Sequence, residues 1–347
     1  MKKLSEIVQE FVIIEGACSA GIVTTETLAG GPPSSDLTYV LPGAKSAVVF
    51  AVGIDPKTIP PYLAKKDRLT YEQAYMRTTA LAGGIAFHLS NYLGQKGYPS
   101  VPVADNCVYR PESSGGLYGD YPDIAHRYLA VRSGVGSMGL SGNILTKEHG
   151  AAIVLASTIT TAELLPTDPL PSEENYCDNC RLCMASCVAV FMHPKEKTHI
   201  RLGTYEFEYS KRRHYGRCDC VCSGYTGLHS SGKWSTWSPG RFNIPESDDD
   251  IKAELARMID RHAQWPESSG GRYFFYTDDK LRVSCANCQL VCCPDKDERK
   301  TRYKMLTESG VAVQNPDGTI EAVSPEDAEK ILKNMPDDRR ILYEDIE

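Results

Sequence analysis

The spacing of the cysteines is the feature that most constrains how this chain can fold. A first run follows C-x2-C-x2-C-x3-C, at Cys177, Cys180, Cys183 and Cys187. A second run follows C-x2-C-x3-C, at Cys285, Cys288 and Cys292. This pair of spacings is typical of chains that bind two 4Fe–4S clusters, in which the last cysteine of a run ligates the other cluster. The sequence therefore predicts a lobe folded around two iron–sulfur clusters.

Two clusters need eight thiolates, and the two runs supply seven of them. Cys218, Cys220 and Cys222 lie between the runs, and any one could be the eighth ligand. We expect Cys218, with Cys222 as the first alternative and Cys220 as the second. In the second run Cys292 keeps the expected spacing, whereas Cys293 lies one residue too late, so we expect Cys292 to be the ligand.

Zinc is the alternative reading of these cysteines, because C-x2-C pairs also suit a tetrahedral zinc ion. A zinc site takes four ligands, however, and a run of four followed by a distant run of three does not divide neatly into such sites.

Composition and charge point to a reducing, cytoplasmic setting. The 13 cysteines of the 347-residue chain gather in metal-ligand spacings, not in the pattern of a small disulfide scaffold. The N-terminus shows no signal-peptide core, and no apolar stretch approaches the length of a membrane span. A net charge of −7 argues against a nucleic-acid partner. We expect a cytoplasmic protein without a membrane span.

The pattern of apolar residues divides the chain into two lobes and a tail. The first lobe, residues 1–165, alternates predicted helices with predicted strands, which indicates a layered α/β core. Its helices are expected at 4–15, 71–95 and 122–133, and its strands at 46–54, 101–104 and 151–159. The second lobe, residues 166–300, carries the cysteines. The tail, residues 301–347, is expected to form a β-hairpin and a helix capped by Ser324.

Between the cysteine runs lies a long segment, residues 216–245, that is rich in Gly, Ser and Trp. A long segment without predicted elements is usually functional or disordered, and its aromatic residues argue against disorder. It is predicted either to be an ordered cover over a site or to be a surface loop packed by its own aromatics.

The order of three motifs resembles that of a known superfamily. These motifs are the stretch from Leu41 to Ser46 (LPGAKS), the passage from Ala130 to Gly139 (AVRSGVGSMG) and the two cysteine runs. The chain is similar in them to the epoxyqueuosine reductases and the corrinoid-dependent reductive dehalogenases. The resemblance implies a nitroreductase-like lobe that holds cobalamin and a ferredoxin-like lobe with two 4Fe–4S clusters. It also implies an external electron donor such as ferredoxin or flavodoxin, and a small-molecule substrate.

The same resemblance implies roles for residues of the first lobe. Gly134, Gly136 and Gly139 would let the backbone approach a flat macrocycle, with Arg132 and Ser141 beside them. The alternative for these glycines is a tight helix-to-strand turn without a ligand.

A proton donor is expected above the cobalt, at Asp120 or, as in the dehalogenases, at a tyrosine, here Tyr121. A carboxylic acid that donates near neutral pH needs an environment that disfavours its charged form. Asp120 could equally cap the helix that follows it.

Three functional hypotheses follow. The first is a cobalamin-dependent and iron–sulfur-dependent reductase acting on a small molecule or a modified nucleoside. The second is an electron-transfer protein that carries only the clusters. The third is an iron–sulfur flavoprotein, because nitroreductase-like folds also bind flavin. We favour the first, and cofactor content distinguishes the three.

Overall fold

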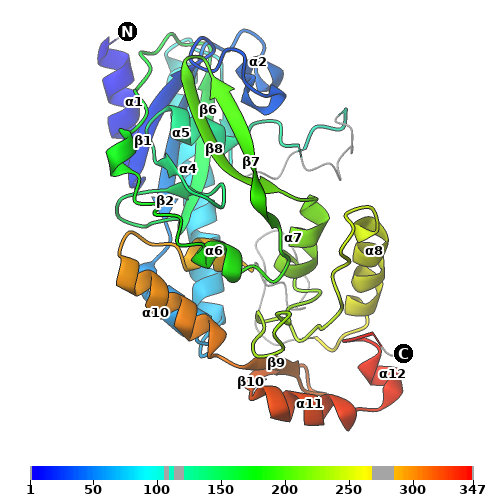
Figure 1. Cartoon of the computed structure of the whole chain (residues 1–347). Coiled ribbons are helices and arrows are strands. Elements are labelled where there is room, and N and C mark those ends of the chain that lie inside the picture. Colours follow the sequence, from blue (N-terminus) through cyan, green and yellow to red (C-terminus); the bar gives the residue numbers. More distant parts are fainter. Residues whose placement is uncertain (1, 105–108, 113–120, 268–284, 346–347) are drawn as a thin grey trace. The chain divides into compact units, whose positions relative to one another are not determined.

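The computed structural model describes residues 2–104, 109–112, 121–267 and 285–345, and it contains two compact units (Figure 1). Unit 1 consists of residues 1–54, 77–180 and 196–210, and unit 2 of residues 55–76, 181–195 and 211–347. The units interleave along the chain because two short segments pack away from their sequence neighbours. They therefore divide the chain at other places than the predicted boundaries at 165 and 300.

A four-stranded antiparallel sheet forms the centre of unit 1. Every neighbouring pair of strands is antiparallel. The order across the sheet is β1 (Ser19–Thr24), β2 (Ser46–Gly53), β6 (Ile153–Thr160) and β3 (Ser100–Val103). Three of these strands lie where the apolar runs predict them. The mixed α/β class is confirmed.

Both faces of this sheet are covered, which explains why β2 is apolar along almost its whole length. On one face lie α1 (Lys2–Ile14) and α4 (Leu69–Gln95), where the hydroxyl of Thr158 donates to the carbonyl of Ala86 at 3.0 Å. On the other face lies α5 (His126–Arg132), whose buried His126 ring meets the Ser157 hydroxyl at 2.8 Å. A strand packed on both faces reads as a continuous apolar run.

A hairpin from the cysteine-rich half of the sequence completes the core of unit 1. It consists of β7 (Met192–Leu202) and β8 (Tyr205–Arg212). Ile200, Leu202 and Tyr209 join the apolar cluster that contains α5. The hydroxyls of Tyr128 and Tyr209 are 2.8 Å apart. The sequence did not predict these strands, because charged residues dominate them.

Short elements complete unit 1. They are the helix α2 (Leu37–Val40), the two-stranded ribbon of β4 (Ser137–Met138) and β5 (Ile144–Leu145), and 3-10 turns that include η1 (Pro33–Ser35) and η4 (Ser172–Glu174). The ribbon follows α5 directly, so the glycine passage forms the turn between a helix and a sheet.

Unit 2 is built mainly from short helices. They are η2 (Pro56–Thr58), α3 (Ile59–Leu63), α6 (Leu182–Ala185), α7 (Tyr215–Cys222), α8 (Ile251–His262), α9 (Asn287–Leu290), α10 (Lys296–Thr307), α11 (Pro325–Lys333) and α12 (Asp337–Arg340). The aromatic segment 216–245 lies inside this unit, with Trp234, Trp237 and Phe242 buried. The indole N–H of Trp237 donates to the carbonyl of Tyr62 at 3.0 Å. Its aromatic residues therefore form part of the core of unit 2.

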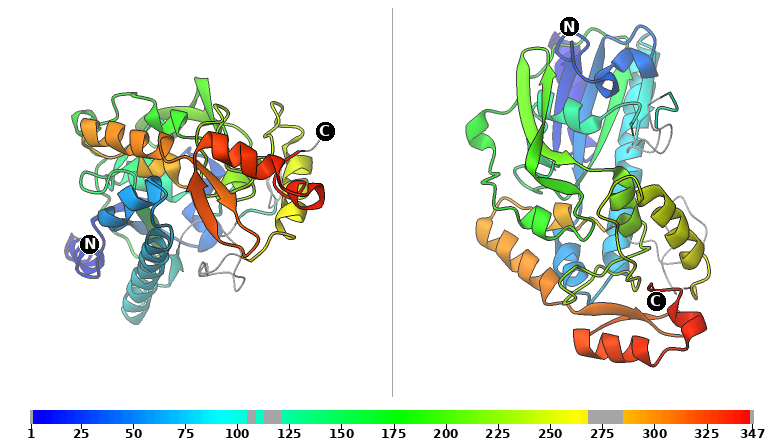
Figure 2. Two further views of the ribbon diagram at one scale, coloured as in Figure 1. Left: turned by 90° about the horizontal axis from the view of Figure 1, so that it is seen from below. Right: turned by 45° about the vertical axis from the view of Figure 1, so that its right-hand side comes forward.

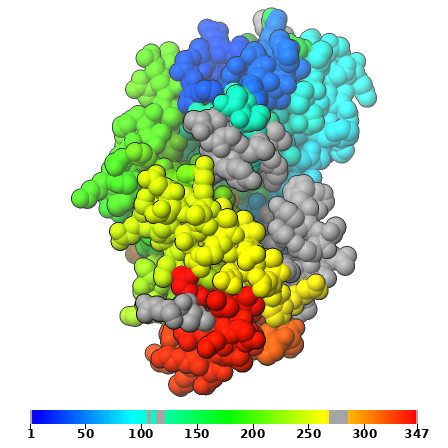
Figure 3. All heavy atoms as spheres, turned by 90° about the vertical axis from the view of Figure 1, so that its right-hand side faces the viewer, coloured from blue at the N-terminus to red at the C-terminus, as the bar shows by residue number. Residues whose placement is uncertain are grey.

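The tail also belongs to unit 2. Its hairpin, β9 (Val311–Gln314) and β10 (Ile320–Val323), packs against α11, as Figure 2 shows. The side chain of Ser324 caps α11, as the sequence predicts. Figure 3 shows the tail in red beside the yellow segment that contains α8, and Arg257 of α8 is paired with Asp345 at 2.5 Å.

Within the described residues, none of the helices is both long and apolar enough to cross a membrane.

Gly134 is the position in unit 1 where we expect a side chain to be least tolerated. Its φ is +72°, and an added Cβ would lie 2.4 Å from the carbonyl oxygen of Asp168. Gly134→Ala should therefore lower the free energy of unfolding by about 1–3 kcal/mol, read from urea denaturation. Gly84→Ala is the matched control, because a Cβ there meets nothing within 4 Å inside α4. That variant should be neutral or stabilised by roughly 0.5–1 kcal/mol.

Lys65 gives unit 2 a pH-dependent stability. Burial lowers the pKa of Lys65 from 10.5 to about 7, and Ser309 is its hydrogen-bond partner. Between these pH values the unfolded chain binds more protons than the folded chain, so this lysine makes stability rise with pH by at most about 1.4 kcal/mol per unit. Lys65→Met should be more stable than the native chain at pH 7, and urea midpoints should show the gap closing towards pH 9. Lys66→Met, at the exposed neighbouring position, should show no such trend.

Candidate metal centre

The two cysteine runs share one local backbone conformation. In the C-x2-C steps that begin at Cys180 and at Cys285, the residue after the first cysteine is left-handed, Arg181 with φ +61° and Ala286 with φ +43°. Each of these residues directly precedes a four-residue helix, α6 or α9. The turn lets the backbone N–H of Asn287 donate to the sulfur of Cys285. The repeated spacing in the sequence therefore corresponds to a repeated fold that presents sulfur atoms and peptide donors together.

Five thiols of unit 2 lie near one another, and we call them the five-thiol set. The sulfur of Cys285 interacts electrostatically with Cys187, Cys288 and Cys222. The sulfur of Cys218 is in hydrogen-bond contact with Cys222 and interacts with Cys187 and Cys288. The fold thus brings together the fourth cysteine of the first run, two cysteines of the second run and two cysteines of α7.

The helix α7 separates its three cysteines by face. Residues four positions apart lie on one side of a helix, and Cys218 and Cys222 both belong to the five-thiol set. Cys220 lies on the other side, fully buried in an apolar cluster with Phe242 and Met258. Burial raises the pKa of Cys220 to about 12. This thiol behaves as a small core residue.

Burial and neighbouring thiols raise the pKa of three members of the five-thiol set. Burial, and secondarily Cys288, raises the pKa of Cys187 to about 11. Burial also raises the pKa of Cys285, while the hydrogen bond with Cys222 contributes most to the raised pKa of Cys218. Neighbouring buried thiolates repel one another. The positive charge of a bound metal offsets this repulsion, so thiols that coordinate a metal lose their protons. Metal binding here would release protons.

A buried donor at the same place lacks a partner. The side-chain nitrogen Nδ2 of Asn287, between Cys285 and Cys288, makes no hydrogen bond within the described residues, and the residue is 3% exposed. A buried amide donor needs an acceptor. The sulfides and thiolates of an iron–sulfur cluster are acceptors of this kind, and hydrogen bonds to them tune the cluster. The residues therefore fit an iron–sulfur cluster.

A single metal ion fits this part of the chain less well. Among the residues that the structure describes, no three His, Cys, Asp or Glu side chains are placed to hold one ion. Zinc requires its sulfur ligands at about 2.3 Å from one point. A cluster spreads its ligands over four irons, so its protein sulfurs lie farther apart.

None of the 12 described cysteines is in a disulfide.

The first cysteine of the first run lies against the glycine passage within unit 1. The backbone N–H of Leu140 donates to the sulfur of Cys177 at 3.3 Å. Asn175 supports this contact, because its side chain bonds both the carbonyl of Met138 and the N–H of Cys177, each at 3.1 Å. Sequence reasoning missed the Leu140 donor, since a backbone N–H is the same for almost any residue type.

The remaining cysteines of the runs have different surroundings. Cys183 is buried in α6, and Cys180 is exposed, with its N–H bonded to Asp178 at 3.2 Å. Cys293 is buried, and its thiol donates to the carbonyl of Asp295 at 3.5 Å. The choice of Cys292 over Cys293 as a ligand stays a prediction.

The predicted cofactor-binding glycines pack against the chain itself. An added Cβ at Gly136 would lie 2.7 Å from the carbonyl oxygen of Leu145, and one at Gly139 would lie 3.1 Å from the Leu145 side chain. Together with Gly134, these positions allow the helix-to-ribbon turn to pack closely. Arg132 is buried and donates to the carbonyl of Thr167 at 3.4 Å, and Ser141 is also buried. The cofactor-binding role of these five residues stays a prediction.

The predicted proton donors are only partly within the described residues. Asp120 lies outside them. Tyr121 is half-buried, and its carbonyl accepts from the N–H of Arg110 at 2.8 Å. The nearby Asp123 carboxyl accepts from the N–H of Ile124 at 2.7 Å, and burial raises its pKa. Their catalytic role stays a prediction.

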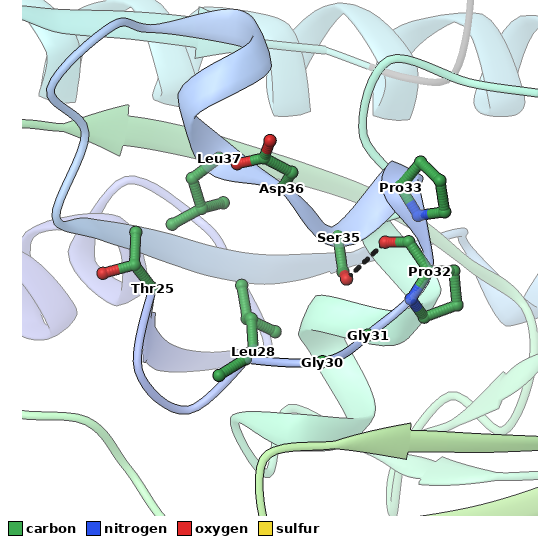
Figure 4. A pocket seen from close by; sticks show the side chains of 10 residues that line it. Thr25, Leu28, Gly30, Gly31, Pro32, Pro33, Ser35, Asp36 and Leu37 are labelled. Atoms are coloured by element: carbon green, nitrogen blue, oxygen red, sulfur yellow. Dashed lines mark hydrogen bonds between the residues drawn. The ribbon is translucent and has the colours of Figure 1, made fainter.

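A pocket of about 340 Å³ opens on the surface of unit 1 (Figure 4). Its residues lie far along the chain from the two cysteine runs. Its wall is formed by residues between Thr25 and Leu37, where the Ser35 hydroxyl donates to the carbonyl of Pro32 at 2.7 Å. Asp36 is the one ionisable residue among those lining it, and its carboxylate caps α2. The lining offers apolar and backbone contacts without a set of reactive groups.

The fold and the site define a mixed α/β protein with five neighbouring thiols in its second unit. An epoxyqueuosine reductase of Atelocyanobacterium thalassa is 26% identical over 182 residues, which cover 52% of this chain and 54% of that protein. One of Gloeobacter violaceus is 25% identical over 160 residues, or 45% of this chain and 44% of that protein. The chain spans about half the length of these curated relatives.

The fold has a counterpart among solved structures. A reductive dehalogenase for which a B12-dependent mechanism has been suggested superposes with a TM-score of 0.50 and 13% identity, covering 92% of this chain and 40% of that one. No protein-family profile matches the chain. The chain is thus similar in sequence to epoxyqueuosine reductases and similar in fold to a reductive dehalogenase.

Proposed function

We propose that this chain is an oxidoreductase that passes electrons through two 4Fe–4S clusters to a bound cobalamin. These electrons would be used to reduce a small organic substrate. The substrate chemistry would resemble that of an epoxyqueuosine reductase or of a dehalogenase. A low-potential donor such as ferredoxin or flavodoxin would supply the electrons. The observation that carries the proposal is the five-thiol set of unit 2.

The chain's own residues hold and insulate a cluster in this proposal. Cys187, Cys285 and Cys288, with a thiol of α7, supply four ligands. The N–H of Asn287 bonds the Cys285 sulfur, and its orphaned side-chain amide can donate to a sulfide. Tyr62 is buried near Cys285, and Trp237 packs on it with ring centres 6.0 Å apart. These rings would keep water from the cluster, which influences its potential.

The proposal of cobalamin rests on the relatives. When bound, a corrinoid supplies a low-potential cobalt centre for reductive chemistry. The glycines of unit 1 pack closely against Asp168 and Leu145, and their predicted contact with the corrinoid carries no part of this proposal. An electron-transfer protein that carries only clusters, or an iron–sulfur flavoprotein, is the alternative.

Cofactor content tests the proposal. The chain is purified without oxygen from cells supplied with cobalamin, and iron, sulfide, cobalt and flavin are assayed together with a visible spectrum. About eight irons and one cobalt per chain would support the full proposal. About eight irons without cobalt would leave an electron carrier, or a flavoprotein if flavin is found. A chain that takes up no iron, even after reconstitution, would refute the iron–sulfur assignment.

A further inference from the structure

The five-thiol set holds one thiol more than a 4Fe–4S cluster requires. A cluster of this type takes four protein thiolates. Cys187, Cys285 and Cys288 each have a fixed place in the repeated spacing, so they account for three of the four. The fourth position then falls to α7, which presents both Cys218 and Cys222.

The two α7 thiols are close enough to serve the same position. Their sulfur atoms are in hydrogen-bond contact, and each also interacts electrostatically with at least one further thiol of the set. Cys218 interacts with Cys187 and Cys288, whereas Cys222 interacts with Cys285. A cluster that lies among these sulfurs is therefore flanked by both thiols.

The helix that carries the pair is held firmly at its start. Arg217 is 2% exposed, and its guanidinium donates to Asp248 at 2.5 Å and to the carbonyl of Glu246 at 2.6 Å. The helix backbone therefore keeps its place, and a change of ligand needs only rotation about a cysteine side-chain bond, which has three staggered positions.

We propose that Cys218 and Cys222 are exchangeable ligands for one coordination position of an iron–sulfur cluster. The inference rests on the proposed cluster binding of this unit. At any moment one thiolate binds iron, and the other, as a thiol, donates a hydrogen bond to it. Exchange moves one proton from the incoming thiol to the outgoing thiolate, so the charge of the site is unchanged.

Variants of α7 test this redundancy. Cys218→Ala, Cys222→Ala, the double variant and Cys220→Ala are prepared as the full chain and reconstituted without oxygen. Iron and sulfide are measured, and the reduced clusters are followed by EPR during a redox titration. Cys220→Ala is the matched control, because its thiol is on the same helix but in the apolar cluster.

We expect each single variant to keep about eight irons per chain and the double variant to keep about four. Each single variant should also titrate at a lower potential than the native chain, because its ligand has lost a hydrogen bond. The inference is overturned if one single variant loses about four irons, or if the double variant keeps all eight. A native chain without iron would instead refute the proposed function, so the two failures are distinguishable.

Discussion

Cys288→Ala should remove one iron–sulfur cluster and leave the other. Cys288 interacts with both Cys285 and Cys218, and it has no neighbouring spare thiol at its own place in the run. We expect iron and sulfide to fall from about eight to about four per chain. Anaerobic reconstitution followed by iron and sulfide assays checks this result.

The control for this variant is Cys220→Ala. Its thiol is packed with Phe242, Ile251 and Met258, so the native iron content should be kept. Retention of all the iron by Cys288→Ala would mean that the five-thiol set does not hold a cluster in the way we propose.

Trp237→Ala should destabilise unit 2 more than other single changes in the aromatic segment. The indole is 7% exposed, donates to the carbonyl of Tyr62 and packs on the Tyr62 ring. Removing it leaves a large cavity and takes one donor from the Tyr62 carbonyl, which still accepts from the N–H of Lys65. We expect this loss of packing to lower the free energy of unfolding by about 3–5 kcal/mol. Urea denaturation monitored by far-UV circular dichroism measures the change.

Trp237→Phe separates packing from hydrogen bonding. It keeps an aromatic ring against Tyr62 and loses the N–H donor, so we expect a smaller loss, about 1 kcal/mol. An unfolding midpoint of Trp237→Ala equal to that of the native chain would show that the aromatic segment is not part of the core.

The strands and helices of unit 1 that the sequence predicted are those with an uninterrupted pattern of apolar residues. β2 and β6 are buried on both faces, so their apolar runs are visible without any partner. The β7–β8 hairpin gave no such signal, because many of its residues are charged and only a few, among them Ile200, Leu202 and Tyr209, enter the core.

For the candidate site, too, the sequence predicted one part and the structure decided another. The spacing of Cys285 and Cys288 predicted a metal-binding turn, and the left-handed Ala286 is what such a turn needs. Spacing left three choices, Cys218, Cys220 and Cys222, and we expected Cys218 with Cys222 second. The structure sets Cys220 apart and presents the other two together, which depends on the direction of a helix face.

The sequence by itself determined the mixed α/β class and predicted metal binding by the cysteine runs, because periodic burial and ligand spacing are local properties of the chain. Only the tertiary structure decided that residues 196–210 join unit 1, that the glycines pack against Asp168 and Leu145, and that five thiols converge in unit 2. These are contacts between residues far apart in the chain. They depend on which surfaces pack together, and no local pattern of residue types records that choice.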